Sequence, residues 1–483
     1  MSSADEGREV PPQSAHDVAV PPALTEIMTT GWATMSTPPR HCDDSSRRAA
    51  ARHRERLCLE LPDRLVVIPS GIPRRRAGDQ PFPFRTSSDF IWLTGSQEPY
   101  AVLVMDTSDP DSAKLYRHPG GLRSDDRFWT DRELGELWTG RRPGQDLARV
   151  AYGVRCADLD ALPRSLPSAA VVRGSDSQID AMFASTPGDS ELTTALARLR
   201  LVKDDWETAQ LRAAVNATVS GFVDIRDDWS QVRRQGERFV DATFLRRARL
   251  EGNGVGYSSI CASGSNASTL HWTANDGPVG DDDLVLIDVG VEMDSLYTAD
   301  ITRVLPASGR FSAEQRDLYQ VVLDAQEAAL STLRPGVAFR AAHQAAIEVI
   351  TDGLIATGIL RVSKDEALDP ERQLYRRYTL CGTGHMLGLD VHDCGSAAPV
   401  DYPGGQLHAG HVLTVEPGIY LQPDDLTVPP QLRGTGIRIE DDVLVTANGY
   451  EILSASLPRR PDDVESWLAG STYNGSGDHR SAR

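Results

Sequence analysis

Five residues that can bind hard metal ions are spread over the second half of the chain. They are Asp288, Asp300, His385, Glu416 and Glu440, and each lies in a glycine-rich segment or a strand-like apolar run. Four carboxylates and one imidazole suit a pair of divalent cations better than a single ion, and oxygen-rich ligation favours Mn²⁺, Mg²⁺ or Ca²⁺. Two adjacent divalent metals can activate water for hydrolysis. These residue types therefore predict a hydrolase with a dinuclear metal centre.

The two aspartates stand at the ends of neighbouring apolar runs. Asp288 lies near the end of the run 284–289, and Asp300 begins the run 300–305, twelve residues further on. A carboxylate in an apolar setting needs a compensating partner, which a metal would supply. We expect the two runs to form a hairpin that brings Asp300 beside Asp288 on one face. Taken alone, a pair of turn or edge aspartates explains the pattern equally well.

The histidine candidates lie in a glycine-rich stretch. His385 follows Cys381-Gly-Thr-Gly, where glycines allow a close approach of the backbone and a metal. His392 comes seven residues later, which is not a standard spacing for two ligands of one metal. We therefore expect His385 to bind metal and His392 to face the substrate or support the ligands. A lone histidine is more often an ordinary core or surface residue, so this interpretation depends on the nearby carboxylates.

The two glutamates belong to strand-like segments. Glu416 ends the apolar run 412–415 and is followed at once by Pro-Gly, and Glu440 alternates with Arg438 in another expected strand. A buried glutamate on a strand is costly unless it is compensated. One shared cation site explains these four acids and the glycine-flanked His385, whereas a plain structural or interaction protein would require them to coincide by chance.

Length and local pattern indicate how the chain is organised. A chain of 483 residues is too long for one ordinary core, so we expect two domains. Residues 1–45 are rich in Pro, Ser, Thr and charge and are expected to form a disordered tail, as are residues 467–483. Short apolar runs mixed with helical segments indicate an α/β domain over 46–195, ahead of a catalytic domain over 196–466. The helical spacing over 191–225 predicts a helix that connects the two.

Composition excludes several classes of protein. The net charge of −19 disfavours nucleic acid as a partner. The sequence contains no run of about 18 consecutive apolar residues, so no membrane span is predicted. The N-terminus is acidic without an apolar segment, so we expect a cytoplasmic protein. The six cysteines show no CxxC spacing, which argues against a disulfide framework and against a zinc site built from cysteine.

Taken together, the motifs resemble those of a known family. The segments VLIDVG, ADITR, GTGHMLGLDVHD, LTVEPGIY and GIRIEDDVLV are similar to those of the Xaa-Pro aminopeptidases, or aminopeptidase P, of metallopeptidase family M24B. This resemblance covers about 200–463, and a weaker one covers the N-terminal domain, where residues 84–95 resemble the family's N-terminal signature. It implies an α+β fold with a "pita-bread" catalytic domain behind an α/β creatinase-like N-terminal domain. Prolidase and methionine aminopeptidase belong to the same group, but the latter generally lacks a large N-terminal domain.

The resemblance implies a role for each metal ligand. Asp288 would bind one metal, His385 and Glu416 the other, and Asp300 and Glu440 would bridge the two, with Mn²⁺ as the expected metal. Glu416 is the best candidate to carry a proton to the leaving nitrogen.

Further residues match family positions around the substrate. His271, in Ser268-Thr-Leu-His271-Trp, and His392 match histidines that face the substrate or its tetrahedral intermediate. Arg438, Tyr257 and Tyr420 match positions that support the site. The expected activity is hydrolysis of the bond between an N-terminal residue and a penultimate proline, in peptide substrates. The resemblance also implies a homodimer or homotetramer.

Two features depart from the family pattern. The family usually has a histidine four residues before the metal-binding one, and this chain has Cys381 there. A thiol is a weak hydrogen-bond donor without positive charge, so substrate orientation or rate could suffer. The interval between Asp288 and Asp300 is also one residue longer, which a hairpin loop should absorb. Two alternatives therefore remain: a prolidase that acts on Xaa-Pro dipeptides, and a specialised or inactive pita-bread protein.

Overall fold

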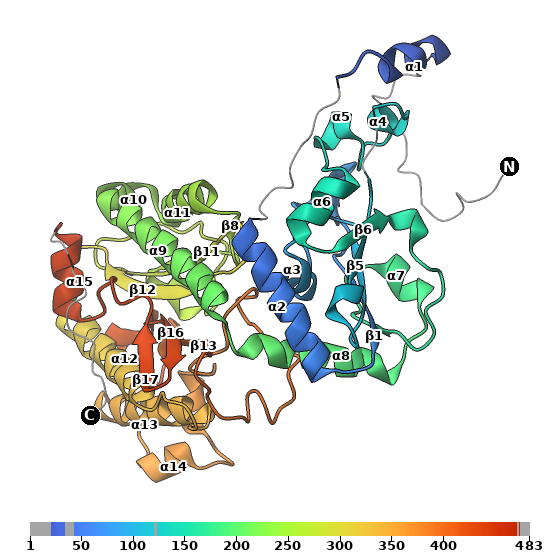
Figure 1. The fold of residues 1–483 in the computed structure, drawn as a ribbon. Coiled ribbons are helices and arrows are strands. Elements are labelled where there is room, and N and C mark those ends of the chain that lie inside the picture. The colour runs from blue at the N-terminus through green and yellow to red at the C-terminus, as the bar shows by residue number, and fades with distance from the viewer. Residues whose placement is uncertain (1–20, 34–42, 120–122, 471–472, 474–483) are drawn as a thin grey trace. The chain divides into compact units, whose positions relative to one another are not determined.

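The computed structural model describes residues 21–33, 43–119, 123–470 and 473. The chain divides into two units, Met1–Ala195 and Leu196–Arg483, each built around its own core (Figure 1). Both units mix helices with short strands. No helix within the described ranges is long and apolar enough to cross a membrane.

The first unit contains a five-stranded sheet in the order β6-β5-β4-β1-β7. Its strands are β1 (Leu65–Pro69), β4 (Val102–Asp106), β5 (Lys114–Arg117), β6 (Arg155–Asp158) and β7 (Ala170–Val171). The pairs β1–β4 and β4–β5 are antiparallel, and β1–β7 and β5–β6 are parallel. Two apolar runs of this domain thus become strands β1 and β4 of a mixed sheet, whereas the apolar run 90–93 lies in helix α3 (Ser88–Thr94).

Helices and a small hairpin complete this unit. They are α1 (Pro22–Thr29), α2 (Asp44–Glu60), β2 (Arg75–Ala77), β3 (Gln80–Pro81), α3 (Ser88–Thr94), α4 (Arg127–Thr130), α5 (Glu136–Thr139), α6 (Gln145–Tyr152), α7 (Ser177–Met182) and α8 (Pro187–Leu201), the last of which crosses the boundary between the units. Helix α2 begins where the side chain of Asp43 accepts a hydrogen bond from the Ser46 N–H. On α2, His53 stacks on Trp92 of α3 with ring centroids 4.2 Å apart.

The expected terminal tails need correction where the structure describes them. Helix α1 and the start of α2 lie within residues 1–45, so that segment is not without structure throughout. Proline at the first helical position suits the start of α1, because that N–H has no partner inside a helix. At the other end, α15 (Pro461–Leu468) extends past residue 466. The remainder of both expected tails lies largely outside the described residues.

The second unit has its deepest strand in the predicted hairpin. Strand β10 (Leu284–Val289) lies between β9 (Ile260–Ser263) and β12 (Ile301–Pro306) and pairs antiparallel with both. All six residues of β10 are buried, as the continuous apolar run predicts. The predicted hairpin is confirmed, with Asp288 opposite Thr302.

Short breaks separate β13 from β14 and β15 from β16 in the last part of this unit. The strands are β13 (Val412–Val415), β14 (Gly418–Leu421), β15 (Thr435–Arg438), β16 (Asp441–Thr446) and β17 (Gly449–Ile452). β13 pairs with β16 in one sheet, and β14 pairs with β15 in another. The chain therefore changes sheet after β13 and again after β15.

Helices of this unit pack against these sheets. They are α9 (Asp205–Asp227), α10 (Trp229–Gln235), α11 (Glu237–Glu251), α12 (Ala313–Ser331), α13 (Arg340–Ala356), α14 (Lys364–Leu368) and α15, and a short pair of strands, β8 (Gly254–Val255) and β11 (Val291–Glu292), joins them. α9 packs against α11, and α12 against α13 (Figure 1). Helix α11 also packs on β9, and α12 on β13. Leu318, Val322 and Ala325 of α12 are buried at helical spacing.

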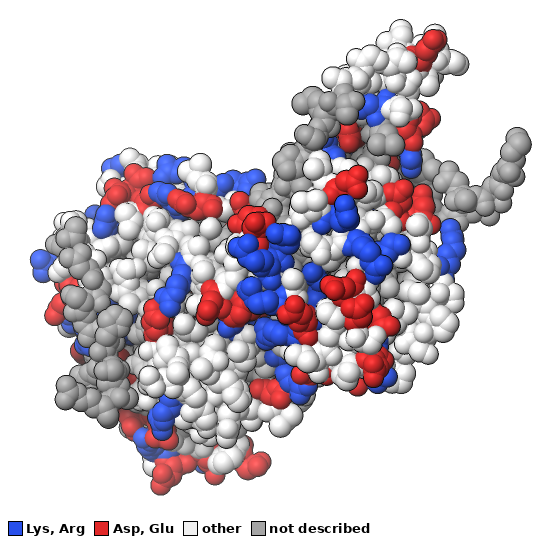
Figure 2. All heavy atoms as spheres, viewed as in Figure 1, with Lys and Arg blue, Asp and Glu red and all other residues white. Residues whose placement is uncertain are grey.

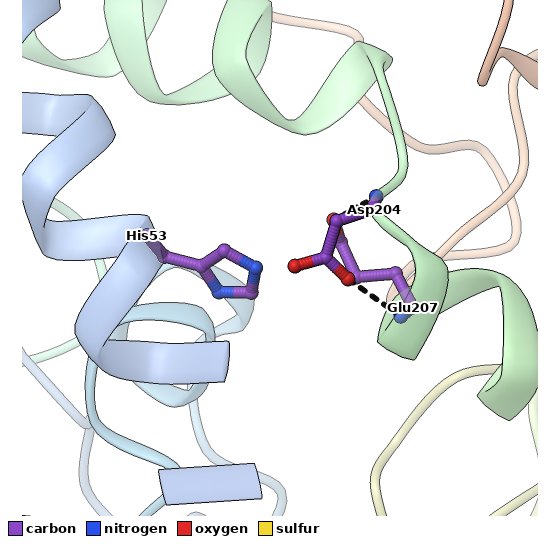
Figure 3. A group of neighbouring side chains, drawn as sticks. All are labelled: His53, Asp204 and Glu207. Atoms are coloured by element: carbon purple, nitrogen blue, oxygen red, sulfur yellow. Dashed lines mark hydrogen bonds between the residues drawn. The ribbon is translucent and has the colours of Figure 1, made fainter. Parts of the chain in front are cut away.

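The single helix predicted over 191–225 is instead two helices. α8 ends at Leu201 and α9 begins at Asp205. Asp204 caps α9 by accepting from the Glu207 N–H at 2.9 Å, and the Glu207 carboxylate accepts from the Asp204 N–H at 2.8 Å (Figure 3). This capping box favours a new helix start over continuation, because it satisfies N–H groups that a helix start leaves open.

Charged side chains of both signs are interspersed on the face drawn in Figure 2. Several pair at the surface of the second unit, including Arg316 with Asp462 at 2.6 Å and Lys364 with Asp352 at 2.7 Å. Exposed pairs of this kind contribute little to stability, typically about 0–1 kcal/mol each.

Candidate metal centre and active site

Asp288 and Asp300 come together at the end of the β10–β12 hairpin. Their exposed fractions are only 7% and 5%. The hydroxyl of Tyr257 lies 2.6 Å from Asp288 Oδ1 and 2.5 Å from Asp300 Oδ1. A hydroxyl carries one proton, so it can donate to one of the two carboxylates at a time. Burial, together with the neighbouring charge of Asp300 and against the opposing effect of Arg438, raises the pKa of Asp288 to about 6.

The two glutamates lie at the breaks between strands. Glu416 falls between β13 and β14, and Glu440 falls between β15 and β16. The expectation that Glu440 lies within a strand is therefore wrong, although Arg438 does end β15. Burial, and then the nearby charges of Asp300 and Glu416, raise the pKa of Glu440 well above its usual value. In a regular strand, successive side chains point to opposite faces of the sheet. A break in the strand frees an acidic side chain from this alternation, so that it can point into the interior shared with the other acids.

His385 faces this group of acids through one ring nitrogen. Its Nε2 lies 3.3 Å from Asp300 Oδ2 and 3.5 Å from Glu416 Oε1. Its Nδ1 lies 3.2 Å from the Met386 carbonyl oxygen, which can only accept, so Nδ1 carries a proton. Although burial opposes the charged form, Asp300 and Glu416 raise the pKa of His385 to about 9. This orientation leaves Nε2 as the atom that can bind a metal.

The predicted ligands fit a divalent metal centre by their chemistry. Ligand atoms of Asp300, His385 and Glu440 all lie within 4.8 Å of one another. Asp288 contacts the hydroxyl that also contacts Asp300, and Glu416 lies beside His385. Burial and the neighbouring carboxylates raise the pKa values of Asp288 and Glu440 although Arg438 opposes the rise, and hard cations would supply the further positive charge that these acids need. The donor set therefore fits the expected divalent ions.

Arg438 connects the acids to their surroundings. Its Nη2 lies 2.5 Å from Asp288 Oδ2, its Nη1 donates to the Tyr420 hydroxyl at 2.8 Å, and its Nε donates to Thr302 Oγ1 at 3.0 Å. The Thr302 hydroxyl in turn donates to Glu440 Oε2 at 2.6 Å. Tyr420 is 7% exposed, and burial raises its pKa to about 12, so its hydroxyl keeps its proton at neutral pH. One guanidinium thus contacts the ligand Asp288 directly and reaches a second ligand, Glu440, through Thr302.

Sequence reasoning missed two residues of this network. Thr302 could have been found from the hairpin register, because it lies two positions after Asp300 and opposite Asp288. His343 on α13 offered no local signal; its Nδ1 lies 3.0 Å from Thr383 Oγ1. The Thr383 carbonyl accepts from the Glu416 N–H at 2.8 Å, so His343 supports the loop before His385.

The glycine before His385 is required by backbone packing. A Cβ at Gly384 would lie 2.1 Å from the carbonyl oxygen of Thr414, far inside van der Waals contact. The Thr414 N–H donates to the His385 carbonyl at 2.9 Å, and the Thr414 hydroxyl accepts from the His385 N–H at 3.2 Å. Gly384 therefore lets the backbone before His385 pack directly against Thr414 of β13. The hydrogen bonds to Thr414 then fix the backbone from which the His385 imidazole projects.

Three of the predicted site residues, His271, Cys381 and His392, are exposed. His392 packs edge-to-face on His385 with ring centroids 4.4 Å apart. Partial burial, and then the charges of His385 and His271, lower the pKa of His392. His271 is exposed just after the short 3₁₀ turn at 264–268. Cys381 is exposed, and desolvation of its thiol followed by the charge of Glu416 raises its pKa, so it is uncharged at neutral pH.

Comparisons with known proteins agree with this arrangement. Residues 209–447 match metallopeptidase family M24, and residues 50–177 match the aminopeptidase P N-terminal domain. The chain is 45% identical to Xaa-Pro aminopeptidase 2 of Streptomyces coelicolor over 457 residues, which is 92% of this chain and 96% of that relative. It is 33% identical to Xaa-Pro aminopeptidase of Escherichia coli K12, covering 88% of this chain and 98% of that protein.

Solved structures lead to the same group. The structure of aminopeptidase P from E. coli with the inhibitor Pro-Leu superposes with a TM-score of 0.77 at 31% identity. The match covers 88% of this chain and 98% of that chain, so it includes both units.

Proposed function

The chain belongs to metallopeptidase family M24, and we propose that it is an Xaa-Pro aminopeptidase, hydrolysing the bond between an N-terminal residue and a penultimate proline. Its fold is the pita-bread α+β catalytic domain with an aminopeptidase P N-terminal domain, as the resemblance implied. The observation that carries the proposal is the convergence of Asp300, His385 and Glu440 in a buried cage within a chain that matches Xaa-Pro aminopeptidases along nearly their whole length.

The proposed cofactor is a pair of Mn²⁺ ions. Asp288, Asp300, His385, Glu416 and Glu440 would hold them, since these side chains offer hard oxygen donors and one imidazole. When bound, divalent ions of this kind polarise a carbonyl and make water a better nucleophile near neutral pH.

The remaining work falls to side chains of this chain. The Glu416 side chain is 19% exposed at its strand break, so it can reach the substrate side of the cage and move a proton to the leaving nitrogen. His392 is exposed and packs on the ring of His385, and His271 is exposed as well. Both can donate hydrogen bonds to the oxygen that gains charge. Arg438 fixes the Asp288 carboxylate through its contact at 2.5 Å.

A substrate with proline second suits a dedicated site. The proline nitrogen carries no hydrogen in the peptide, and its ring restricts the residue before it. A general peptidase that relies on that N–H therefore binds such bonds poorly. The leaving nitrogen must gain a proton, and this is the role proposed for Glu416.

Cys381 is the feature that favours the second candidate, a specialised or inactive member of the family. It occupies the place where the family usually has a histidine, so a specialised or inactive relative would differ at this residue. Prolidase activity on Xaa-Pro dipeptides would use the same ligands and differ in peptide length. We favour the aminopeptidase because the relatives that match nearly the whole chain are Xaa-Pro aminopeptidases.

Release of the first residue from three peptide types tests the proposal. The metal-stripped and Mn²⁺-loaded full-length protein would be compared on Xaa-Pro-Yaa, Xaa-Pro and Xaa-Ala-Yaa. We expect Mn²⁺-dependent cleavage of Xaa-Pro-Yaa only. Cleavage restricted to Xaa-Pro would establish prolidase activity, and no cleavage by the loaded protein would support the specialised relative. Substituting other divalent ions in the same assay identifies the preferred metal.

Further properties are proposed on the resemblance. The domains are proposed to span 46–195 and 196–466, the assembly to be a homodimer or homotetramer, and the location to be the cytoplasm. Limited proteolysis tests the domain limits, light scattering tests the assembly, and cell fractionation tests the location. Neither nucleic acid nor membrane is a proposed partner.

A further inference from the structure

A buried ion cluster lies directly beside the substrate-facing histidine. Asp393, the neighbour of His392, is 2% exposed. Its Oδ2 accepts from Lys203 Nζ at 3.0 Å, and its Oδ1 accepts from Arg200 Nη2. Both cations are nearly buried, with exposed fractions of 6% for Arg200 and 5% for Lys203. They come from a segment about 190 residues earlier in the chain.

The cluster holds the loop that connects His385 to His392. The Asp393 N–H donates to the Met386 carbonyl at 2.9 Å, which closes the loop 386–393 on itself. A Cβ at Gly388 would lie 2.1 Å from Asp393 Oδ2, so the carboxylate is packed against the loop backbone. The Gly388 carbonyl accepts from the Thr298 N–H at 3.1 Å, which ties the loop to the segment before Asp300.

The two cations belong to a segment that is hydrogen-bonded to other parts of the catalytic unit. The Lys203 N–H donates to the Gly410 carbonyl at 2.9 Å, and the capping box of Asp204 and Glu207 follows at once (Figure 3). Glu207 Oε1 also accepts from the Tyr297 hydroxyl at 2.7 Å. The segment 200–207 therefore holds the loop that carries His392 and the segment that leads to Asp300.

His392 itself has little to orient it. Its side chain is exposed and makes no hydrogen bond to any residue that the structure describes, and its ring rests on the edge-to-face contact with His385. The location of the His392 ring therefore depends on the position of the His392 backbone. That backbone is held in place by the contacts of the next residue, Asp393.

We propose that Asp393 is a positioning residue for the reaction: held by Arg200 and Lys203, it fixes the loop 386–393 so that His392 stands over the site. This inference rests on the proposed aminopeptidase function. Asp393 acts through His392, while the metal ligands keep their own contacts. Burial alone would raise the pKa of Asp393, but Arg200 and Lys203 lower it to about 2, so the cluster stays ionised at working pH.

A double-mutant cycle between the two neighbours tests the idea. Mn²⁺-loaded wild type, Asp393→Asn, His392→Ala and the double variant would be compared by kcat and KM on Xaa-Pro-Yaa. We expect Asp393→Asn to lower kcat/KM about tenfold to hundredfold when His392 is present, and less than about twofold when it is alanine, because residues that act as a unit are not additive. Equal losses in both backgrounds would overturn the proposal.

A second variant and a matched control keep the result interpretable. If Asp393→Asn does not fold, Lys203→Met, which leaves the pair of Asp393 with Arg200, replaces it in the same cycle, with the same two outcomes. Asp224→Asn removes a carboxylate bonded to Arg247 between α9 and α11, and it should leave kcat/KM unchanged in both backgrounds. Failure of the wild type to cleave would sink the proposed function, whereas cleavage with an additive cycle would sink only this inference.

Discussion

Arg438 Nη2 lies 2.5 Å from Asp288 Oδ2, and both side chains are less than one-tenth exposed. The contact joins the end of β15 to the end of β10, two strands in different sheets. A buried charge pair of this kind is expensive to break, because each partner loses its compensation. The pair therefore fixes the orientation of a predicted metal ligand.

Replacing Arg438 with methionine should destabilise the enzyme and impair its activity. We expect the free energy of unfolding of the metal-stripped protein to fall by about 3–5 kcal/mol, since Asp288 is left buried and uncompensated. In the loaded enzyme we expect kcat/KM to fall by at least about tenfold, or about 1.4 kcal/mol of transition-state stabilisation. Urea unfolding and steady-state kinetics measure the two effects.

Arg212→Met is the control for that change. Arg212 pairs with Glu451 at 2.6 Å, but the two side chains are 41% and 33% exposed, so the expected cost is only about 0–1 kcal/mol. An equal fall in the free energy of unfolding for the two variants would show that the buried Arg438–Asp288 contact contributes no more to stability than the exposed pair.

Replacing Cys381 with histidine should improve catalysis. A histidine donates stronger hydrogen bonds than a thiol whose pKa is raised, and a bond to a charged group is worth about 1.5–3 kcal/mol. We expect Cys381→His to raise kcat/KM on Xaa-Pro-Yaa about tenfold and Cys381→Ala to match the wild type. A Cys381→Ala variant with much lower activity would instead mean that the thiol itself contributes.

Removing the metals should abolish cleavage and lower the melting temperature. Binding to the folded state alone stabilises it, by about 2.7 kcal/mol at a hundredfold excess over Kd, and the buried acids of the cage repel one another without cations. Chelation followed by differential scanning calorimetry and activity assays tests this. Glu440→Gln should lose metal affinity, while Glu451→Gln, at the surface pair, should behave as wild type. Full activity in verified metal-free protein would contradict the dinuclear mechanism.

Acid should remove the stabilisation that Asp393 provides. Its folded-state pKa of about 2 lies below the ordinary value of 3.8, so its contribution is present above about pH 4 and is lost as the pH falls towards 2. The shift corresponds to about 2 kcal/mol. We expect the difference in unfolding free energy between the wild type and Asp393→Asn to shrink by that amount between pH 5 and 2. Urea unfolding at several pH values measures it, and a constant difference would refute the buried ion cluster.

The hairpin illustrates what could be predicted from sequence. Two apolar runs with a carboxylate near the end of each indicated that Asp288 and Asp300 would meet, and the paired strands confirm the hairpin. The continuous helix predicted over 191–225 was wrong because helical spacing continues through the capping box at Asp204, and spacing does not show where a helix restarts.

Local features of the chain were enough to predict which residues could do the chemistry. Rare buried acids, a glycine-flanked histidine and strand-like runs are local features, and local composition and spacing reveal them. The tertiary structure alone decided how they meet: the strand breaks at Glu416 and Glu440, the bridge through Thr302, and the hold of Arg200 and Lys203 on Asp393. These contacts join residues more than 100 positions apart. Local pattern cannot encode them, because they form only when separate segments pack together and must compensate buried charge.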